Sequence, residues 1–107
     1  MTQVTFTLPP TLATLPLAER DSLIRAGLFE AVQSRMHQLT AEIEESERHI
    51  QRYEEKYGVS LARFEVEQLP DLDTLAAHED YNDWFFWTET RQQNQHILAE
   101  LKKAYVD

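Results

Sequence analysis

Cysteine is absent from this sequence, and glycine and proline are scarce. Without cysteine among its 107 residues, the chain forms neither disulfides nor thiolate-based sites, as is usual in a reducing cytoplasm, the location that we expect. Two glycines are too few for a glycine-rich phosphate loop. Three of the four prolines lie before residue 17, and the fourth is Pro70. The stretches 17–57 and 71–107 therefore contain no proline and, of the glycines, only Gly27, which favours two long helices.

Long apolar runs and a leader-like segment are also missing. The longest apolar runs are a handful of residues, against the roughly 20 that a membrane-spanning helix needs. The opening MTQVTFTLPP has neither the basic nor the apolar region of a secretory signal peptide. With 42% apolar residues, the chain is expected to be neither disordered nor a membrane protein, and its length fits one domain with a modest core.

Basic residues are outnumbered. Ten lysines and arginines stand against nineteen acidic residues, which gives a formal charge of −9. Nucleic-acid binding depends mainly on lysine and arginine neutralising phosphates, so this balance is unfavourable for it. An acidic surface serves solubility, and it equally suits a basic protein partner. The charge balance leaves both of these roles open.

The first residues show the alternation of a half-buried strand. In QVTFTLP, Val4, Phe6 and Leu8 alternate with polar residues. A single strand cannot satisfy its own backbone groups, and no second strand is evident in the sequence. The segment therefore pairs with a second copy of the chain, pairs with another protein, or forms an extended N-terminal arm, 1–16, that packs its apolar side chains on helices.

A heptad pattern runs through the first long stretch. Its seam, spaced alternately three and four residues apart, consists of Phe29, Val32, Met36, Leu39, Ile43, Ser46, Ile50, Tyr53 and Tyr57. Only Ser46 interrupts the apolar character of this seam. Four such heptads are typical of a long helix packed along its length at a shallow angle, as in a coiled coil. Upstream, Leu23, Ile24 and Leu28 widen the stripe, so the first turns are expected to contact more than one neighbour.

The rest of the chain predicts a short helix and a second long one. Gly58 follows the seam where helices commonly end in a left-handed glycine, and Ser60 is a suitable N-cap for a helix over 61–69 that Pro70 ends. The last helix is expected from about Asp80 to Tyr105. Its candidate caps are Asp71, Asp73 and Asp80. The fold class is therefore all-α, a long antiparallel helical hairpin over 17–107 with a short connecting helix, assembled as a dimeric helix bundle.

Four aromatic residues stand side by side in the segment HEDYNDWFFWTE. Successive side chains of a helix turn by about 100°, so these rings point around most of the helix, whereas one neighbouring helix covers a stripe little wider than about 100°. Other segments of the same chain, a second copy or a different protein must cover the rest. The candidate dimer or partner interface comprises Val4, Phe6, Leu8, Phe29, Tyr81, Trp84, Phe85, Phe86 and Trp87.

Patterns that indicate catalysis or metal binding are missing. The four histidines are scattered, and HEDYN has Asn82 where the zinc-protease pattern requires a second histidine. His78, Asp80 and Asp83 form a possible metal set, but acids at the start of a helix more often stabilise its N-terminus. The Glu-x-x-His spacing of di-iron bundles is not found. We expect no enzymatic activity, no metal and no cofactor.

A strand followed by two helices is also the order of elements in ribbon–helix–helix repressors, whose paired strands enter the major groove of DNA. In this alternative, Val4, Phe6 and Leu8 would face the core, and Gln3, Thr5 and Thr7 would face the bases. Pro16 leaves a first helix of barely six residues, PTLATL, and the strand has no Arg or Lys. A DNA-binding autorepressor is therefore the alternative function.

Three short motifs resemble a family of small, mostly uncharacterised prokaryotic helical proteins that are regarded as the antitoxin-like half of two-gene toxin–antitoxin modules. These are KYG at 56–58, LARFE at 61–65 and HEDYNDW at 78–84, and the similarity spans about residues 23–101. The resemblance implies a non-catalytic protein that dimerises and sheathes a small toxin-like partner. We therefore expect a protein–protein interaction subunit that forms a homodimer and neutralises a small basic partner.

Overall fold

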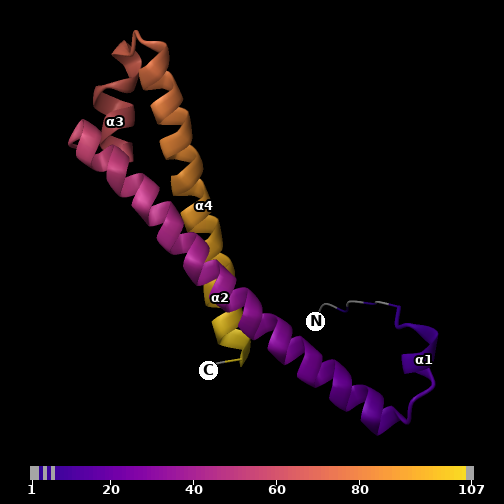
Figure 1. The fold of residues 1–107 in the computed structure, drawn as a ribbon. Helices are drawn as coiled ribbons and strands as arrows, with labels where there is room; N and C mark the ends of the chain where they lie inside the picture. Colours follow the sequence, from indigo (N-terminus) through magenta and orange to yellow (C-terminus); the bar gives the residue numbers. More distant parts are fainter. Residues whose placement is uncertain (1–2, 4, 6, 106–107) are drawn as a thin grey trace. The chain divides into compact units, whose positions relative to one another are not determined.

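The computed structural model describes residues 3, 5 and 7–105, and every regular element in them is helical (Figure 1). In chain order they are α1 (Pro10–Ala13), α2 (Leu17–Tyr57), α3 (Leu61–Glu67), the 3₁₀ turn η1 (Leu69–Asp71) and α4 (Leu75–Tyr105). The chain divides into two compact units, Met1–Ser34 (unit 1) and Arg35–Asp107 (unit 2), and α2 contributes residues to both. The all-α class predicted from the sequence is confirmed.

Helix α2 covers the range that the proline spacing and the heptad seam predict, Leu17–Tyr57. It is followed by Gly58, whose φ of 72° lies in the left-handed region. The amide of Gly58 donates to the carbonyl of Glu54 at 2.7 Å and so closes the last turn. A side chain at this φ would be strained, which is why a glycine suits the position.

Helix α3 begins as predicted and ends early. The hydroxyl of Ser60 accepts a hydrogen bond from the amide of Arg63 at 3.3 Å, so Ser60 is the N-cap. The helix ends at Glu67 instead of residue 69, and Pro70 lies in the turn η1. Proline lacks an amide proton, clashes with the carbonyl four residues earlier and disfavours helical geometry at the residue before it. Pro70 therefore ends α3 at Glu67, earlier than the predicted residue 69.

Helix α4 starts at Leu75, several residues before the predicted start near Asp80. The amide of Ala77 donates to the hydroxyl of Thr74 at 3.2 Å, so Thr74 caps the helix and none of the three candidate aspartates does. A capping side chain must reach the amides two or three residues ahead, and Thr74 stands at the right distance from Ala77. Asp80 instead lies one and a half turns inside α4, where it bonds to side chains of α2.

In unit 2, α4 runs back along the second part of α2, and α3 lies at the end of the hairpin where the chain passes from α2 to α4 (Figure 1). Four side-chain contacts between α2 and α4 show the direction of packing: Tyr57 with Asp80, Tyr53 with Asp83, His49 with Trp87, and Glu42 with Asn94. Each step backward along α2 is matched by a nearly equal step forward along α4. The antiparallel hairpin predicted from the sequence is therefore present in this unit.

The core of unit 2 lies between the three helices. Ile50, Phe64 and Trp84 form its buried cluster, one residue from each of α2, α3 and α4. Along the seam, Met36 and Leu39 are buried as predicted. Ser46 is fully buried too, and its hydroxyl donates to the carbonyl of Glu42 at 3.0 Å, which satisfies a polar group inside the helix packing.

Unit 1 departs from the extended arm expected over 1–16, because Pro10–Ala13 form a short helix with Pro10 at its first position. The described residues before Pro10 contain no strand, and Val4 and Phe6 lie outside the described residues. A small apolar pocket joins this segment to the first turns of α2. It is lined by Leu8, Leu12, Leu15, Arg20, Leu23 and Ile24. A guanidinium nitrogen of Arg20 donates to the carbonyl of Ala13 at 3.1 Å and holds the segment there.

Candidate interaction surface

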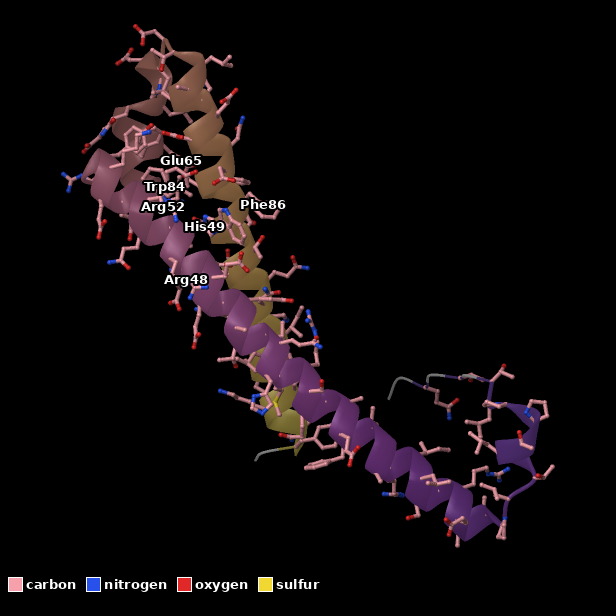
Figure 2. All side chains as sticks on the ribbon, in the orientation of Figure 1. Arg48, His49, Arg52, Glu65, Trp84 and Phe86 are labelled. Carbon is pink, nitrogen blue, oxygen red and sulfur yellow. The ribbon has the colours of Figure 1, made fainter. Side chains whose placement is uncertain are left out.

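Trp84, one of the predicted interface residues, is instead a core residue. Its side chain is fully buried between α2 and α4 (Figure 2). Ring centroids of Phe64, Tyr57 and Tyr53 lie 5.2, 5.8 and 5.9 Å from it. Trp84 is buried because α3 covers it in addition to α2, and the two helices together enclose the ring.

Three tyrosines around Trp84 each donate a hydrogen bond to a carboxylate on another helix. Tyr53 donates to Asp83 at 2.5 Å and Tyr57 to Asp80 at 2.6 Å, both across the α2–α4 contact. Tyr81 of α4 donates to Glu65 of α3 at 2.7 Å. Lys56 also reaches Asp80, at 2.5 Å. These bonds satisfy the polar ends of rings whose apolar bodies pack on the core.

The carboxylates shift the titration of these groups. Burial, and next the hydrogen bond to Asp83, raise the pKa of Tyr53 to about 12. Burial and the hydrogen bond to Asp80 raise the pKa of Tyr57 to about 12 as well. The hydrogen bonds from Lys56 and Tyr57 lower the pKa of Asp80. The folded state therefore favours neutral phenols at Tyr53 and Tyr57 and an ionised Asp80.

Trp87 is half-buried and stacks on His49 of α2. The ring centroids are 4.0 Å apart and the planes differ by 2°. A carboxylate oxygen of Glu45 lies 4.0 Å from Nε2 of His49. The heptad pattern does not single out His49, because this residue falls outside the seam of α2. Its position four residues after Glu45 and the antiparallel register that brings it opposite Trp87 are the signals that would have found it.

Phe85 and Phe86 are the two rings of the aromatic row that stay exposed, by 43% and 56% of their surface. Phe85 lies on the side of α3, because its ring is 6.1 Å from Tyr81, which bonds to α3. Phe86 lies 5.1 Å from Trp87 and therefore on the side of His49 (Figure 2). The chain's own segments thus cover Trp84, cover Trp87 in part, and leave the two phenylalanines accessible.

Carboxylates lie near both exposed rings of α4. Glu79 and Asp83 precede Phe86 by seven and three residues on the same side of the helix, and the exposed Arg48 and Arg52 lie on α2 (Figure 2). Beside Phe85 stand carboxylates, Glu65 through Tyr81 and Glu89 one turn along the helix. We name Glu65, Tyr81, Phe85 and Glu89 the α3–α4 surface. It combines an exposed aromatic ring with negative charge.

A polar layer lies further along the hairpin. The amide of Asn94, a buried residue of α4, donates to one carboxylate oxygen of Glu42 at 3.2 Å. Arg35 contacts the other carboxylate oxygen of Glu42 at 3.3 Å. Along α4, residues at the three- and four-residue spacing form a second seam, in which polar Arg91 and Asn94 lie between Trp87 and Leu98. The sequence therefore shows that the middle of this α4 seam is polar, but the partner of Asn94 depends on the register of the hairpin.

The remaining predicted interface residues are spread over both units. Tyr81 is half-buried in unit 2, whereas Leu8 is half-buried in the pocket of unit 1 and Phe29 is exposed there. Among the described residues, no three His, Asp or Glu side chains gather as a metal site would require. Within the same residues, no helix has the length and apolar character to cross a membrane.

Comparisons of the chain with protein-family models, with curated proteins and with solved structures each find no match. The resemblance to antitoxin-like proteins therefore stays a prediction from short sequence motifs.

Proposed function

We propose that this chain is a non-catalytic interaction protein that binds and neutralises a small basic protein, in the manner of an antitoxin. The α3–α4 surface supports this proposal. Phe85 stays 43% exposed beside half-buried Tyr81, and carboxylates flank both rings. Exposed aromatic residues are the side chains that most often anchor protein interfaces.

Charge favours a basic partner. Unit 2 carries sixteen acidic and eight basic residues, a formal charge of −8. A field of this sign raises the association rate of a positively charged protein and disfavours nucleic acid. In the complex, a basic partner would place lysine or arginine beside Glu65 and Glu89 while an apolar side chain covers Phe85.

The two exposed rings of α4 are not equivalent in this proposal. Phe85 lies beside Tyr81, which bonds to Glu65 of α3, whereas Phe86 packs on Trp87. We place the partner's main contact on the Phe85 side, where two helices contribute to the surface. The proposal can therefore be tested by comparing one ring with the other.

The test is binding of purified chain to the purified product of the adjacent gene, measured by calorimetry. We expect a complex, and we expect Phe85→Ala to raise the Kd by at least tenfold, equivalent to about 1.4 kcal/mol. Phe86→Ala should have a smaller effect. Leu17→Ala changes an apolar residue of unit 1 that is more exposed still, at 70%, and serves as the control. Equal loss in all three variants, or an effect confined to Phe86, would contradict the assigned surface.

A DNA-binding autorepressor would give a different result. Such a protein binds duplex DNA with strong salt dependence, and replacing Thr5 and Thr7 with alanine would abolish the binding. Tight, salt-dependent binding to the DNA upstream of its own gene, together with no affinity for the neighbouring gene product, would overturn the proposal.

A further inference from the structure

Helix α3 rests on the hairpin through a single buried side chain. Of its seven residues only Phe64 is buried, two are half-buried and four are exposed. The ring of Phe64 packs among those of Tyr57, Trp84 and Tyr81, at centroid distances of 4.9, 5.2 and 6.0 Å. Burial of apolar surface is the main force that holds one element on another, so α3 is held less firmly than α2 and α4 hold each other.

Polar contacts add little to this attachment. Among the described residues, one hydrogen bond between side chains joins α3 to α4, from the hydroxyl of Tyr81 to Glu65 at 2.7 Å. The chain on both sides of α3 is able to change direction. Gly58, before the helix, has a φ of 72°, and residues 72–74, after η1, have no regular structure. Loop and element-terminal residues of this kind absorb the change of backbone angles when an element moves as a hinged body.

The indole N–H of Trp84 has no acceptor while α3 is in place. Trp84 is fully buried, and its Nε1 donates to no group in the described part of the chain. A buried donor without an acceptor is destabilising, because it has lost its hydrogen bond to water. Phe64 lies against this ring, so movement of α3 away from the hairpin would admit water to it. The unpaired indole therefore lowers the free energy needed to open α3.

We propose that α3 is a hinged cover, which leaves its place on α2 and α4 while the rest of unit 2 stays folded. In the docked state, Phe64 fills the space among three rings and Glu65 accepts the hydroxyl proton of Tyr81. In the open state, the indole of Trp84 contacts water and Tyr81 loses its acceptor. Segments with few buried contacts open in this way without unfolding the whole domain.

Opening of the cover removes part of the α3–α4 surface. Glu65 belongs to α3, and it bonds to Tyr81, whose ring lies 6.1 Å from that of Phe85. The surface is therefore complete only while α3 is docked. A partner that binds this surface also holds α3 in place, and any change that frees α3 weakens binding of the partner. This consequence rests on the proposed function, whereas the opening is a property of the isolated chain.

Hydrogen exchange of the isolated chain tests the opening. The two tryptophans give two indole N–H signals in NMR spectra, and Trp87→Phe identifies the signal of Trp84. We expect the Trp84 indole to be protected at least about tenfold less than the backbone amide of Ile50, which lies in the same core. Its exchange should also depend less on urea, because opening α3 exposes less surface than unfolding the unit. Equal protection and equal urea dependence at both sites would overturn the proposal.

Two tyrosine variants separate the hinged cover from movement of the long helices. Tyr81→Phe removes the hydroxyl that bonds to Glu65, so exchange at Trp84 should increase by about fivefold. Tyr53→Phe is the matched control, since the hydroxyl of Tyr53 bonds to Asp83 across the α2–α4 contact and its ring is 5.9 Å from Trp84. This control should leave exchange at Trp84 unchanged. Equal acceleration in both variants, or none in Tyr81→Phe, would contradict the hinged cover.

A second pair of variants changes α3 itself. Glu65→Gln weakens the bond from Tyr81 and should accelerate exchange at Trp84. Glu67→Gln removes the same charge from α3, but it affects a pair within the helix, with Arg63 at 2.8 Å, and should act less. A larger effect of Glu67→Gln would mean that fraying of α3, and not its release from α4, exposes Trp84. Unchanged far-ultraviolet circular dichroism confirms that the variants fold.

The purified product of the adjacent gene tests the consequence for binding. A partner that holds α3 should slow exchange at Trp84 by at least about tenfold when it is saturating. Binding without this slowing would show that the docked position of α3 is not needed for the complex, which would overturn the coupling. Absence of binding would contradict the proposed function alone, because exchange in the isolated chain decides whether α3 opens.

Discussion

At the scale of single residues, the bonds between tyrosines and carboxylates define the end of the hairpin where α3 lies. Tyr53, Tyr57 and Tyr81 each place a ring against the core and donate a hydroxyl proton to a carboxylate on a neighbouring helix. A hydrogen bond to a charged acceptor contributes about 1.5–3 kcal/mol, more than a neutral pair, although exposure to water weakens it. These bonds therefore fix how the helices sit within this part of unit 2.

The raised tyrosine pKa values predict a loss of stability in alkali. The pKa of Tyr53 and of Tyr57 rises from the ordinary 10.0 to about 12 in the folded chain. Their contribution is fully present below pH 10, where the unfolded chain also keeps its phenols protonated, and is lost as the pH rises toward 12. We expect the free energy of unfolding, measured with urea, to fall across this interval.

Phenylalanine at both positions provides the comparison. The double variant Tyr53→Phe/Tyr57→Phe should be less stable near pH 7, by about 0.5–1.5 kcal/mol for each hydrogen bond lost. Between pH 10 and 12 its stability should decline less steeply than that of the wild type, because neither phenol is left to ionise. Parallel pH profiles for the two proteins would show that other groups cause the alkaline loss.

At the scale of helices, the polar layer of Asn94 and Glu42 explains the polar middle of the α4 seam. The amide of Asn94 reaches a carboxylate oxygen of Glu42 at 3.2 Å, and fully buried Ser46 bonds to the carbonyl of Glu42. Two polar groups facing each other between otherwise apolar seams disfavour any shift of one helix along the other, since a shift would leave both unpaired. The layer therefore specifies the register of the hairpin.

Removing one member of this layer should be worse than removing both. Asn94→Leu removes the donor from one carboxylate oxygen of Glu42, while Arg35 still contacts the other. Because the Glu42 side chain is partly exposed, we expect a loss of about 0.5–1.5 kcal/mol in the free energy of unfolding. The double variant Asn94→Leu/Glu42→Leu should recover much of that loss, because an apolar pair can replace a buried polar one. Urea unfolding curves test this expectation, with Gln92→Leu as an exposed control on the same helix. An additive double variant would contradict the coupling.

The sequence predicts the helices better than it predicts their contacts. The positions of proline and glycine predict both ends of α2, because local backbone preference decides where that helix can begin and end. Thr74 was missed as the cap of α4, since three nearby aspartates offer the same chemistry and only the backbone selects among them. His49 and Glu42 were missed as partners of α4 because they fall outside the heptad seam. Trp84 was predicted to lie at an interface, because its contact with α3 depends on tertiary packing, which the sequence pattern does not show.

At the scale of the whole molecule, negative charge is unevenly distributed along the chain. Unit 2 has a formal charge of −8 and unit 1 only −1. Several exposed carboxylates of α2, among them Glu44 and Glu47, have no ion pair in the described structure, unlike Glu67, which pairs with Arg63 at 2.8 Å. Unpaired like charges oppose compactness, so the same charge that would attract a basic partner also weakens the free protein.

Salt should therefore stabilise the chain when it is alone. The Debye length falls from about 10 Å at 0.1 M to about 3 Å at 1 M salt, which screens repulsion between exposed carboxylates. We expect the midpoint of unfolding in urea, an uncharged denaturant, to rise with NaCl. Glu44→Gln/Glu47→Gln should raise the midpoint at low salt and reduce its dependence on salt, whereas Glu67→Gln, which leaves Arg63 unpaired, should not. A midpoint that falls with NaCl would mean that ion pairs outweigh repulsion. In that case the acidic surface would stabilise the free chain. Repulsion between its carboxylates would then no longer support the proposal of a basic partner.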